Sequence, residues 1–517
     1  MLEKHAESSV GEGGGSGAPI SRRQVLHSGM ASVVRIPLGL AISFFLTPFI
    51  LWKIGVANYG LLGVLNMVSG YLMLLDFGMA QALSKYLAEM MAKGDENGAA
   101  SLLDTMLATY AILGITGSLV VYFALRGPIL RLLGSRGEPA LLGLTLVAFV
   151  LNFCTVPIKR ALIGLHRLDL SATVALLTQV MGAIGTVAVL WAGLGVEGML
   201  WNSIAAAVFA LVLTAVLLRR RWRAFSLWPS RLRPGSLPMI FNFGFKVQFV
   251  GFAAVLSEQL PITLMATYLN LQDVGYYRVA NRFLSQIRGV PFAIMPLVAP
   301  VASALNAVER KQSVLRFYLR AIKYLAMVSF PVLALTAALV LPFVSLWLGT
   351  GYRPAAEAVL LVLPGYVLFI LADLGLNVLN GIGHPEINVY ASWGVTAIIV
   401  VLGVILTRLF GYYGTVAAVG AALFIGWGYA HALGARFLGS SFRETLGWAA
   451  HPLIASAVCG ILVAGGLRLG PGGYLGLVLW AAVFLVLYGA YFLRGPGLDA
   501  YDRTVLNDRL PKVLRIL

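Results

Sequence analysis

Long apolar stretches alternate with short polar connections from about residue 28 to residue 494. Some stretches, such as residues 170–196 and 409–435, contain no Asp, Glu, Lys or Arg. A helix needs about 20 apolar residues to cross the hydrocarbon core of a membrane, whereas a spanning β-barrel would alternate apolar and polar positions. The pattern therefore predicts an all-α integral membrane protein with about fourteen transmembrane helices.

The predicted spans lie near residues 28–51, 57–82, 103–125, 140–162, 169–191, 197–218, 240–268, 276–304, 321–348, 356–381, 388–408, 413–435, 447–467 and 471–493. Composition supports this assignment, because 59% of the 517 residues are hydrophobic and only 11% are charged. A soluble protein of this length would need more polar material to cover its surface. The two cysteines, Cys154 and Cys459, fall inside predicted spans and imply no disulfide framework.

The distribution of positive charge gives the orientation in the membrane. A net charge of +17 could suggest nucleic acid, but most of the 38 Lys and Arg lie in the tails and in loops on one side of the spans. The densest cluster follows the sixth span, between Arg219 and Arg233. The positive-inside rule then places both termini in the cytoplasm. We expect the protein to lie in the cell inner (plasma) membrane. We expect this basic loop to contact membrane lipid headgroups, and we expect no nucleic-acid partner.

Three short motifs recur along the chain with almost the same separation. The pairs are Asn58-Tyr59-Gly60 with Gly275-Tyr276-Tyr277, residues 134–139 with 349–354, and Leu162-Ile163-Gly164 with Leu379-Asn380-Gly381. The order and spacing predict two homologous halves of six spans each. An even number of spans gives both halves the same orientation, so the internal repeat is parallel.

This repeat divides the chain into lobes that face a central cleft. The predicted parts are a disordered cytoplasmic tail (1–27), an N-terminal six-helix lobe (28–218), a basic cytoplasmic linker (219–239), a C-terminal six-helix lobe (240–435), an appended helix pair (436–494) and a cytoplasmic tail (495–517). The first 27 residues are polar and Gly-rich and lack the apolar core of a cleaved signal.

Several sequence motifs resemble those of a known family. They are Pro37 and Pro48 in the first span, Asn58-Tyr59-Gly60-Leu61, Tyr71, Leu75-Asp76-Phe77-Gly78, and residues 274–280. Over residues 25–495 the chain resembles the polysaccharide-exporter branch of the multidrug/oligosaccharidyl-lipid/polysaccharide flippase superfamily. The resemblance implies a flippase that carries a polyprenyl-(di)phosphate-linked oligosaccharide to the outer leaflet by alternating access of two lobes. It also implies other polysaccharide-assembly membrane proteins as partners. In the seventh span, Ser257-Glu258-Gln259 departs from the Asp followed by apolar residues that relatives carry.

Charged residues within spans are the candidate functional residues, because each costs about 2.5–3.5 kcal/mol to insert without a partner or a wet cavity. Arg278 and Arg282 are four residues apart on the eighth span and share a face, with Arg288 further along. Guanidinium groups bind phosphate with two parallel hydrogen bonds, so this basic strip suits a lipid diphosphate. Helix packing is the alternative. Lys246 lies near the inner end of the seventh span. Its side chain could bind phosphate, or it could extend to the membrane interface.

Acidic residues in the spans suggest ion pairs. Arg35 and Asp76 lie at the same estimated depth on consecutive spans and could form a structural bridge or a gate. Glu258 lies at a depth between Arg282 and Arg288 and could pair with either, and Asp373 is a further buried carboxyl candidate.

Motifs for enzymatic chemistry are missing from the sequence. It has no P-loop, zinc-spaced His or Cys cluster, nucleophile elbow or dinucleotide turn, so we expect no cofactor and no enzymatic activity. One alternative is cation-coupled efflux of small molecules. Such a transporter would need carboxylates in a cavity, but in this chain the cationic residues in the spans outnumber the acidic ones. A membrane glycan polymerase or ligase is a third reading, which would need larger external loops than the chain has.

Overall fold

The computed structural model describes residues 22–292, 295–308, 311–467, 472–494, 498, 499, 502 and 504. The described residues form two compact units. Unit 1 comprises the chain up to Phe49 together with Val68–Gly251. Unit 2 comprises Ile50–Met67 and the chain from Phe252 onward. The helix labelled α2 therefore contributes to both units.

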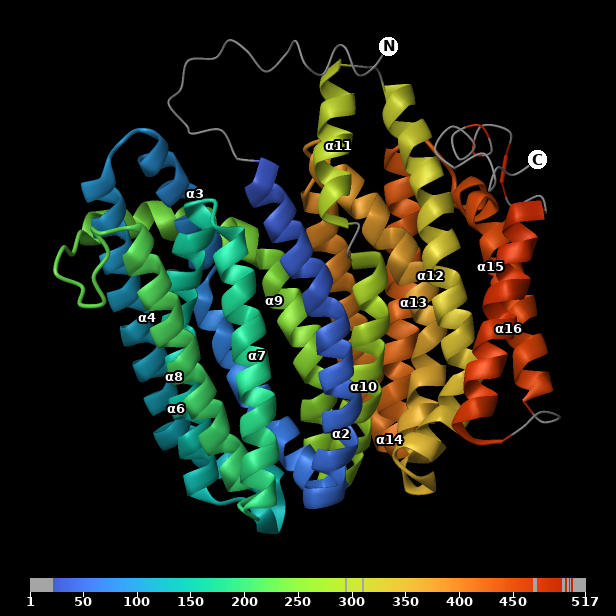
Figure 1. Cartoon of the computed structure of the whole chain (residues 1–517), viewed down its shortest axis with the longest axis horizontal. Coiled ribbons are helices and arrows are strands. Elements are labelled where there is room, and N and C mark those ends of the chain that lie inside the picture. Colours follow the sequence, from blue (N-terminus) through green and yellow to red (C-terminus); the bar gives the residue numbers. More distant parts are fainter. Residues whose placement is uncertain are drawn as a thin grey trace. The chain divides into compact units, whose positions relative to one another are not determined.

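Every element among the described residues is helical (Figure 1). The first part of the chain forms α2 (Arg22–Leu72), η1 (Met73–Asp76), α3 (Met79–Ala92), α4 (Glu96–Ala124), α5 (Arg126–Leu133), η2 (Gly134–Arg136), α6 (Pro139–Gly164), α7 (Leu168–Trp191), α8 (Gly195–Arg221), η3 (Pro234–Ser236) and α9 (Leu237–Tyr268). The remainder forms α10 (Leu271–Phe292), α11 (Met295–Val308), α12 (Lys311–Trp347), η4 (Thr350–Tyr352), α13 (Arg353–Gly381), α14 (Glu386–Phe437), α15 (Phe442–Gly466) and α16 (Gly473–Arg494).

Eleven of the described helices are long and apolar enough to cross a membrane, so the chain is a multi-pass membrane protein. Two of these helices are interrupted by a glycine. Gly55 in α2 and Gly411 in α14 have positive φ angles of 75° and 59°, which a residue with a side chain rarely adopts. Each of these helices therefore contains two straight segments, where the sequence pattern predicted separate spans.

The predicted span 276–304 falls on α10 and α11, and residues 293 and 294 between them lie outside the described residues. Helix α10 is not among the eleven, because Asp273, Arg278, Arg282 and Arg288 make it far more polar than its neighbours.

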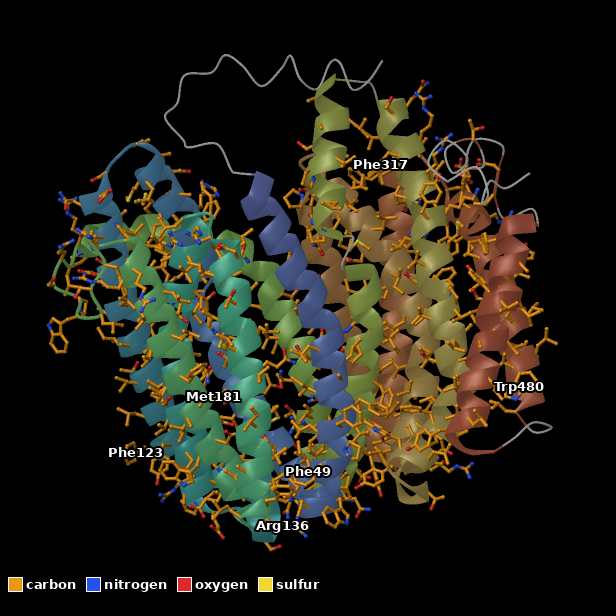
Figure 2. The ribbon with its side chains drawn as sticks, in the orientation of Figure 1. Phe49, Phe123, Arg136, Met181, Phe317 and Trp480 are labelled. Carbon is orange, nitrogen blue, oxygen red and sulfur yellow. The ribbon has the colours of Figure 1, made fainter. Side chains whose placement is uncertain are left out.

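In unit 1, helix α6 packs against α4 and α8, and α7 packs against α8. The core contains Phe153, whose ring contacts the rings of Tyr110 and Phe149. By contrast, Phe123 is 76% exposed and projects from α4 away from the other helices (Figure 2), as expected of a lipid-facing side chain.

A second break in unit 1 changes the predicted span 57–82. Helix α2 ends at Leu72, and Phe77 and Gly78 then adopt left-handed backbone angles before α3 begins. A Cβ atom on Gly78 would lie 2.1 Å from the carbonyl oxygen of Gly244 on α9. Only glycine allows this backbone contact, so the continuous span predicted from apolar residues is wrong at this point.

In unit 2, helix α13 is the most buried span and packs against α10, α11, α12 and α14. Helix α12 also packs against α15, and α15 against α16. Two copies of the repeated sequence motif meet inside this unit. A Cβ atom on Gly60 of α2 would lie 1.8 Å from the oxygen of Leu271, and one on Gly275 of α10 would lie 2.2 Å from the oxygen of Val56. The backbones of α2 and α10 are therefore in direct contact.

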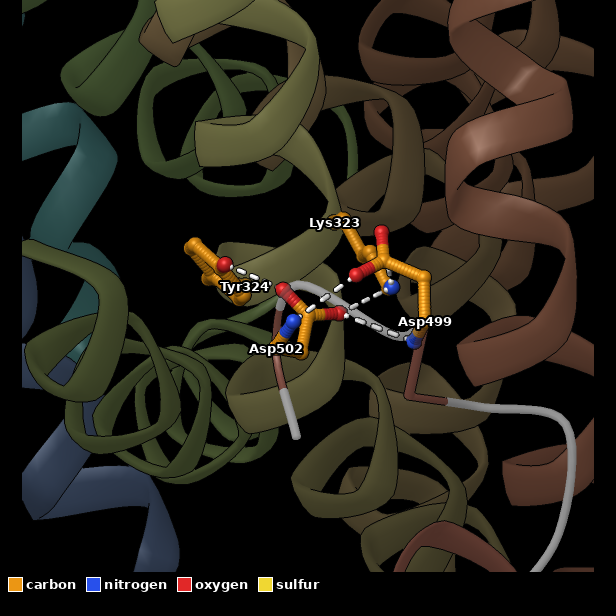
Figure 3. Close-up of polar contacts among 4 residues, drawn as sticks. All are labelled: Lys323, Tyr324, Asp499 and Asp502. Atoms are coloured by element: carbon orange, nitrogen blue, oxygen red, sulfur yellow. Dashed lines mark hydrogen bonds and ion pairs between the residues drawn. The ribbon is translucent and has the colours of Figure 1, made fainter. Parts of the chain in front are cut away.

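Asp499 and Asp502, which follow α16 in the sequence, contact α12 through their charged side chains (Figure 3). The ammonium group of Lys323 pairs with Asp502 and lies 3.4 Å from Asp499. The hydroxyl group of Tyr324 also donates a hydrogen bond to Asp502. Lys323 is only 8% exposed and Asp502 only 2%. We call this arrangement the tail contact.

Candidate functional site

Asp76 lies at the break between η1 and α3 rather than inside a continuous span. Its carboxylate accepts hydrogen bonds from the Tyr110 hydroxyl on α4 and, at 3.3 Å, from the amide of Ala80 in the first turn of α3. An acidic side chain at this end of a helix satisfies an otherwise unpaired amide and interacts favourably with the helix dipole. Arg160 on α6 lies close enough to interact electrostatically with Asp76 and Tyr110. The side chain of Arg35 lies outside the described residues, so its pairing with Asp76 stays a prediction.

We expect Tyr110→Phe to reduce the free energy of unfolding by about 1–3 kcal/mol, because it leaves a half-buried carboxylate short of one donor. Thermal unfolding of the purified protein in detergent measures the change. Tyr122→Phe is the matched control on the same helix, since no hydrogen bond of its hydroxyl is present among the described residues. Equal effects of both substitutions would contradict a specific role for the Tyr110 hydroxyl.

Arg278 on α10 is engaged within unit 2. Its guanidinium donates a hydrogen bond of 3.2 Å to the carbonyl oxygen of Tyr59 and lies 4.8 Å from the centre of the Tyr59 ring. Its aliphatic carbons fill the space beside Gly63. These contacts join α10 to α2, which favours a packing role for this arginine. The i, i+4 neighbour Arg282 is exposed and interacts electrostatically with Arg278.

Arg288 and Glu258 approach the same two tyrosines. Both charged groups lie close enough to interact electrostatically with Tyr277 on α10 and Tyr366 on α13. Glu258 is exposed and Arg288 is half-buried, and no ion pair within 4.0 Å joins them among the described residues. Arg288 and Glu258 are thus near the same two tyrosines, while their predicted pairing and depth stay predictions.

The remaining predicted residues are placed as follows. Asp373 is half-buried on α13. The side-chain amide of Asn377 donates a hydrogen bond of 2.8 Å to the backbone oxygen of Asp373 and also hydrogen-bonds the Asp373 carboxyl group. Lys246 lies on α9, and its side chain is outside the described residues. Arg278, Arg282 and Arg288 are thus in three different environments, not in one uniform strip.

Sequence reasoning missed several polar residues that are buried or half-buried in the structure. Tyr110 and Arg160 lie beside Asp76, and Asp104 on α4 accepts hydrogen bonds from the backbone of the basic loop. A single polar residue within an apolar helix is the signal that could have identified Tyr110 and Asp104, because such groups need a partner when buried.

A pocket of about 570 Å³ lies in unit 2 at the ends of several helices. Its polar lining residues are Asn306, Gln312, His384 and Arg436. The His384 ring packs against Phe437, and its Nδ1 lies 2.9 Å from Glu386. These side chains converge from connections that the sequence placed on the cytoplasmic side.

The fold matches those of solved membrane transporters. A structure described as lipid II flippase MurJ, inward closed conformation, aligns with a TM-score of 0.69 and 13% identity, covering 91% of this chain and 99% of that one. An inward-facing multidrug resistance MATE family transporter of the MOP superfamily aligns with a TM-score of 0.62 and 17% identity, covering 77% and 94% of the two chains. The chain is therefore a multi-pass membrane protein with the fold of the MurJ and MATE transporters.

Residues 54–357, more than half of the chain, match the family described as polysaccharide biosynthesis protein, and the chain belongs to that family. A Bacillus subtilis (strain 168) relative, described as uncharacterized membrane protein EpsK, is 20% identical over 356 residues, covering 67% of this chain and 69% of the relative. The predicted resemblance is thereby confirmed for the polysaccharide biosynthesis family and for the transporter fold.

Proposed function

We propose that this protein is a flippase that moves a polyprenyl-(di)phosphate-linked oligosaccharide across the cytoplasmic membrane for surface polysaccharide biosynthesis. The observation that carries the proposal is a transporter fold in a member of a polysaccharide biosynthesis family. Lipid carriers in such pathways are anionic, so the cargo needs cationic contacts within the membrane. The protein acts as a transporter, by alternating access, and not as an enzyme.

The charged helix α10 supports anionic cargo. Arg282 is exposed and Arg288 half-buried, on a helix that is too polar to count among the eleven apolar helices. Exposed guanidinium groups at membrane depth require a wet cavity or an anionic partner. We assign phosphate recognition to Arg282 and Arg288, while Arg278 holds α10 against α2. Lys246 remains a further candidate for phosphate contact.

The same proposal includes a topology of fourteen spans, with two six-helix lobes (28–218 and 240–435), an appended pair (436–494) and both termini in the cytoplasm. Fourteen spans result if each half of the broken helices α2 and α14 crosses the membrane and the charged helix α10 does so too, which supports the proposal.

Reporter fusions test this topology. A fusion at Arg221 is expected to report the cytoplasmic side, because the surrounding arginines favour retention there, and a fusion at Gly349 the outer side. A reporter in the loop at Gly439 serves as a second cytoplasmic control. If Arg221 and Gly349 report the same side, the topology and the parallel repeat both fail.

The function is tested by measuring lipid-linked glycans in a strain that lacks the protein, separated by leaflet. We expect lipid-linked oligosaccharide to accumulate in the cytoplasmic leaflet, with the amount in the outer leaflet strongly reduced. Normal distribution with increased sensitivity to small toxic molecules would instead favour cation-coupled efflux. Accumulation of unpolymerised units in the outer leaflet would favour a polymerase or ligase.

A further inference from the structure

The basic loop after α8 folds into a defined structure in unit 1. The Asp104 carboxylate accepts hydrogen bonds from the backbone amides of Ser230 and Arg231, at 3.2 and 3.1 Å. The Ser101 hydroxyl donates a hydrogen bond of 2.7 Å to the carbonyl oxygen of Arg231. Asp104 is 3% exposed, so these bonds are shielded from water. A loop that only sets the orientation of the protein through its positive charge needs no fixed structure, whereas this loop is folded against a buried carboxylate.

A groove lies between this loop and α8. Its volume is about 420 Å³, and its lining residues are Val212, Ala215, Val216, Arg219, Arg220, Phe225, Ser226 and Leu227. The α8 residues repeat every three or four positions and so share one helix face. The apolar members lie deeper along α8 and the two arginines stand at its end. The groove is therefore apolar along its length and cationic at its mouth.

The two arginines differ in their contacts. Arg219 donates a hydrogen bond of 2.8 Å to the carbonyl oxygen of Arg223 and another to that of Phe225, which shapes the loop. Arg220 makes no hydrogen bond or ion pair among the described residues and is exposed. Nearby, Trp228 is 81% exposed and Leu227 57%. Exposed indole and aliphatic groups beside arginines are typical of a segment that lies at the membrane interface.

We propose that this groove binds one anionic phospholipid of the cytoplasmic leaflet, with an acyl chain along Val212, Ala215 and Val216 and the phosphate at Arg220. From Val212 to Arg220 the helix rises about 12 Å, close to the depth of one leaflet, about 15 Å. The apolar lining along α8 favours an occupant with an acyl chain over a soluble anion. The surrounding arginines favour a headgroup with net negative charge over a zwitterionic one.

The test is native mass spectrometry of the full chain purified in detergent and titrated with phosphatidylglycerol or phosphatidylcholine. We expect phosphatidylglycerol to bind more tightly, and Arg220→Gln to weaken its binding about tenfold through loss of a charge-assisted hydrogen bond. Val216→Trp fills the groove while keeping every arginine, and it should weaken binding as well. Arg443→Gln, which removes another exposed arginine, is the matched control and should leave binding unchanged.

Arg220 has no described partner and Val216 is 42% exposed, so both variants should keep the unfolding temperature measured without added lipid. Equal binding of the two lipids would overturn the proposal. Equal weakening by Arg220→Gln and Arg443→Gln, or no effect of Arg220→Gln and Val216→Trp, would also overturn it. Undecaprenyl phosphate is added as a competitor. If it binds the groove more tightly than phosphatidylglycerol and displaces it, the groove belongs to a carrier lipid and the assignment fails.

Discussion

Replacing Lys323 with Met is expected to lower the free energy of unfolding of the full chain by about 3–5 kcal/mol. Lys323 is 8% exposed, and its partner Asp502 is 2% exposed. Removing the ammonium group leaves a buried carboxylate whose remaining side-chain donor is the Tyr324 hydroxyl. Thermal or denaturant unfolding in detergent measures the loss, and protease cleavage beyond residue 494 should become faster because the tail contact is released.

The double variant Lys323→Met with Asp502→Leu should recover most of this stability, since two apolar side chains of similar size can replace a buried ion pair. Arg353→Gln is the control in the same unit. Its ion pair with Glu357 spans 2.7 Å, but the arginine side chain is 72% exposed, so a change below about 1 kcal/mol is expected. A double variant as unstable as the Lys323 single variant would contradict the tail contact as described.

The tail contact should also resist mild acid. Burial raises the pKa of Asp502, but the hydrogen bonds from Lys323 and Tyr324 outweigh burial and hold that pKa below its ordinary value of 3.8. A carboxyl whose pKa is lowered on folding adds stability above the ordinary value and loses it as the pH falls through the lowered value. Stabilisation by the tail contact should therefore be complete at pH 5 to 7 and decline only below about pH 3.8.

Replacing Arg288 with Gln is expected to reduce export of the lipid-linked glycan at least about tenfold without reducing the amount of protein in the membrane. Arg288 lies close to Tyr277 and Tyr366 with Glu258 nearby, and we propose that its guanidinium group binds the phosphate of the cargo. Arg288→Lys should restore export only in part, because the ammonium group keeps the charge but loses the planar pair of donors. Arg282→Gln should act in the same direction. Export is measured as lipid-linked glycan in the outer leaflet, and Arg353→Gln again serves as the control.

A purely structural role for Arg288 predicts a different result. If the arginine only balances Glu258, then Glu258→Gln added to Arg288→Gln should restore export. If it binds the cargo phosphate, the double variant should remain inactive. Normal export with Gln at both Arg282 and Arg288 would remove phosphate recognition from α10.

The positions of most spans could be predicted from the sequence because apolar length is a local property. The breaks could not. Phe77 and Gly78 interrupt an apolar segment only because Gly78 contacts the backbone of Gly244, which is far away in the sequence. In the same way, the joined segments of α2 and α14 depend on single glycines that the pattern treated as loops.

The candidate site shows the same limit. The i, i+4 spacing correctly brought Arg278 near Arg282, but spacing along one helix says nothing about the Tyr59 carbonyl that Arg278 contacts. Lys323 was not singled out because its partners Asp499 and Asp502 lie beyond the last span. A buried charge can be identified from its own helix, whereas its partner requires the tertiary structure.

The division of the chain into units constrains any movement between them. The chain passes from one unit to the other at Phe49/Ile50, Met67/Val68 and Gly251/Phe252. The first two points lie inside α2 and the third inside α9, so each crossing is a continuous helix instead of a flexible loop. Rigid-body displacement of the units must therefore bend these helices, and helices bend most readily at proline and glycine. Pro48 and Gly251 stand at two of the crossings, so any such bending is expected there.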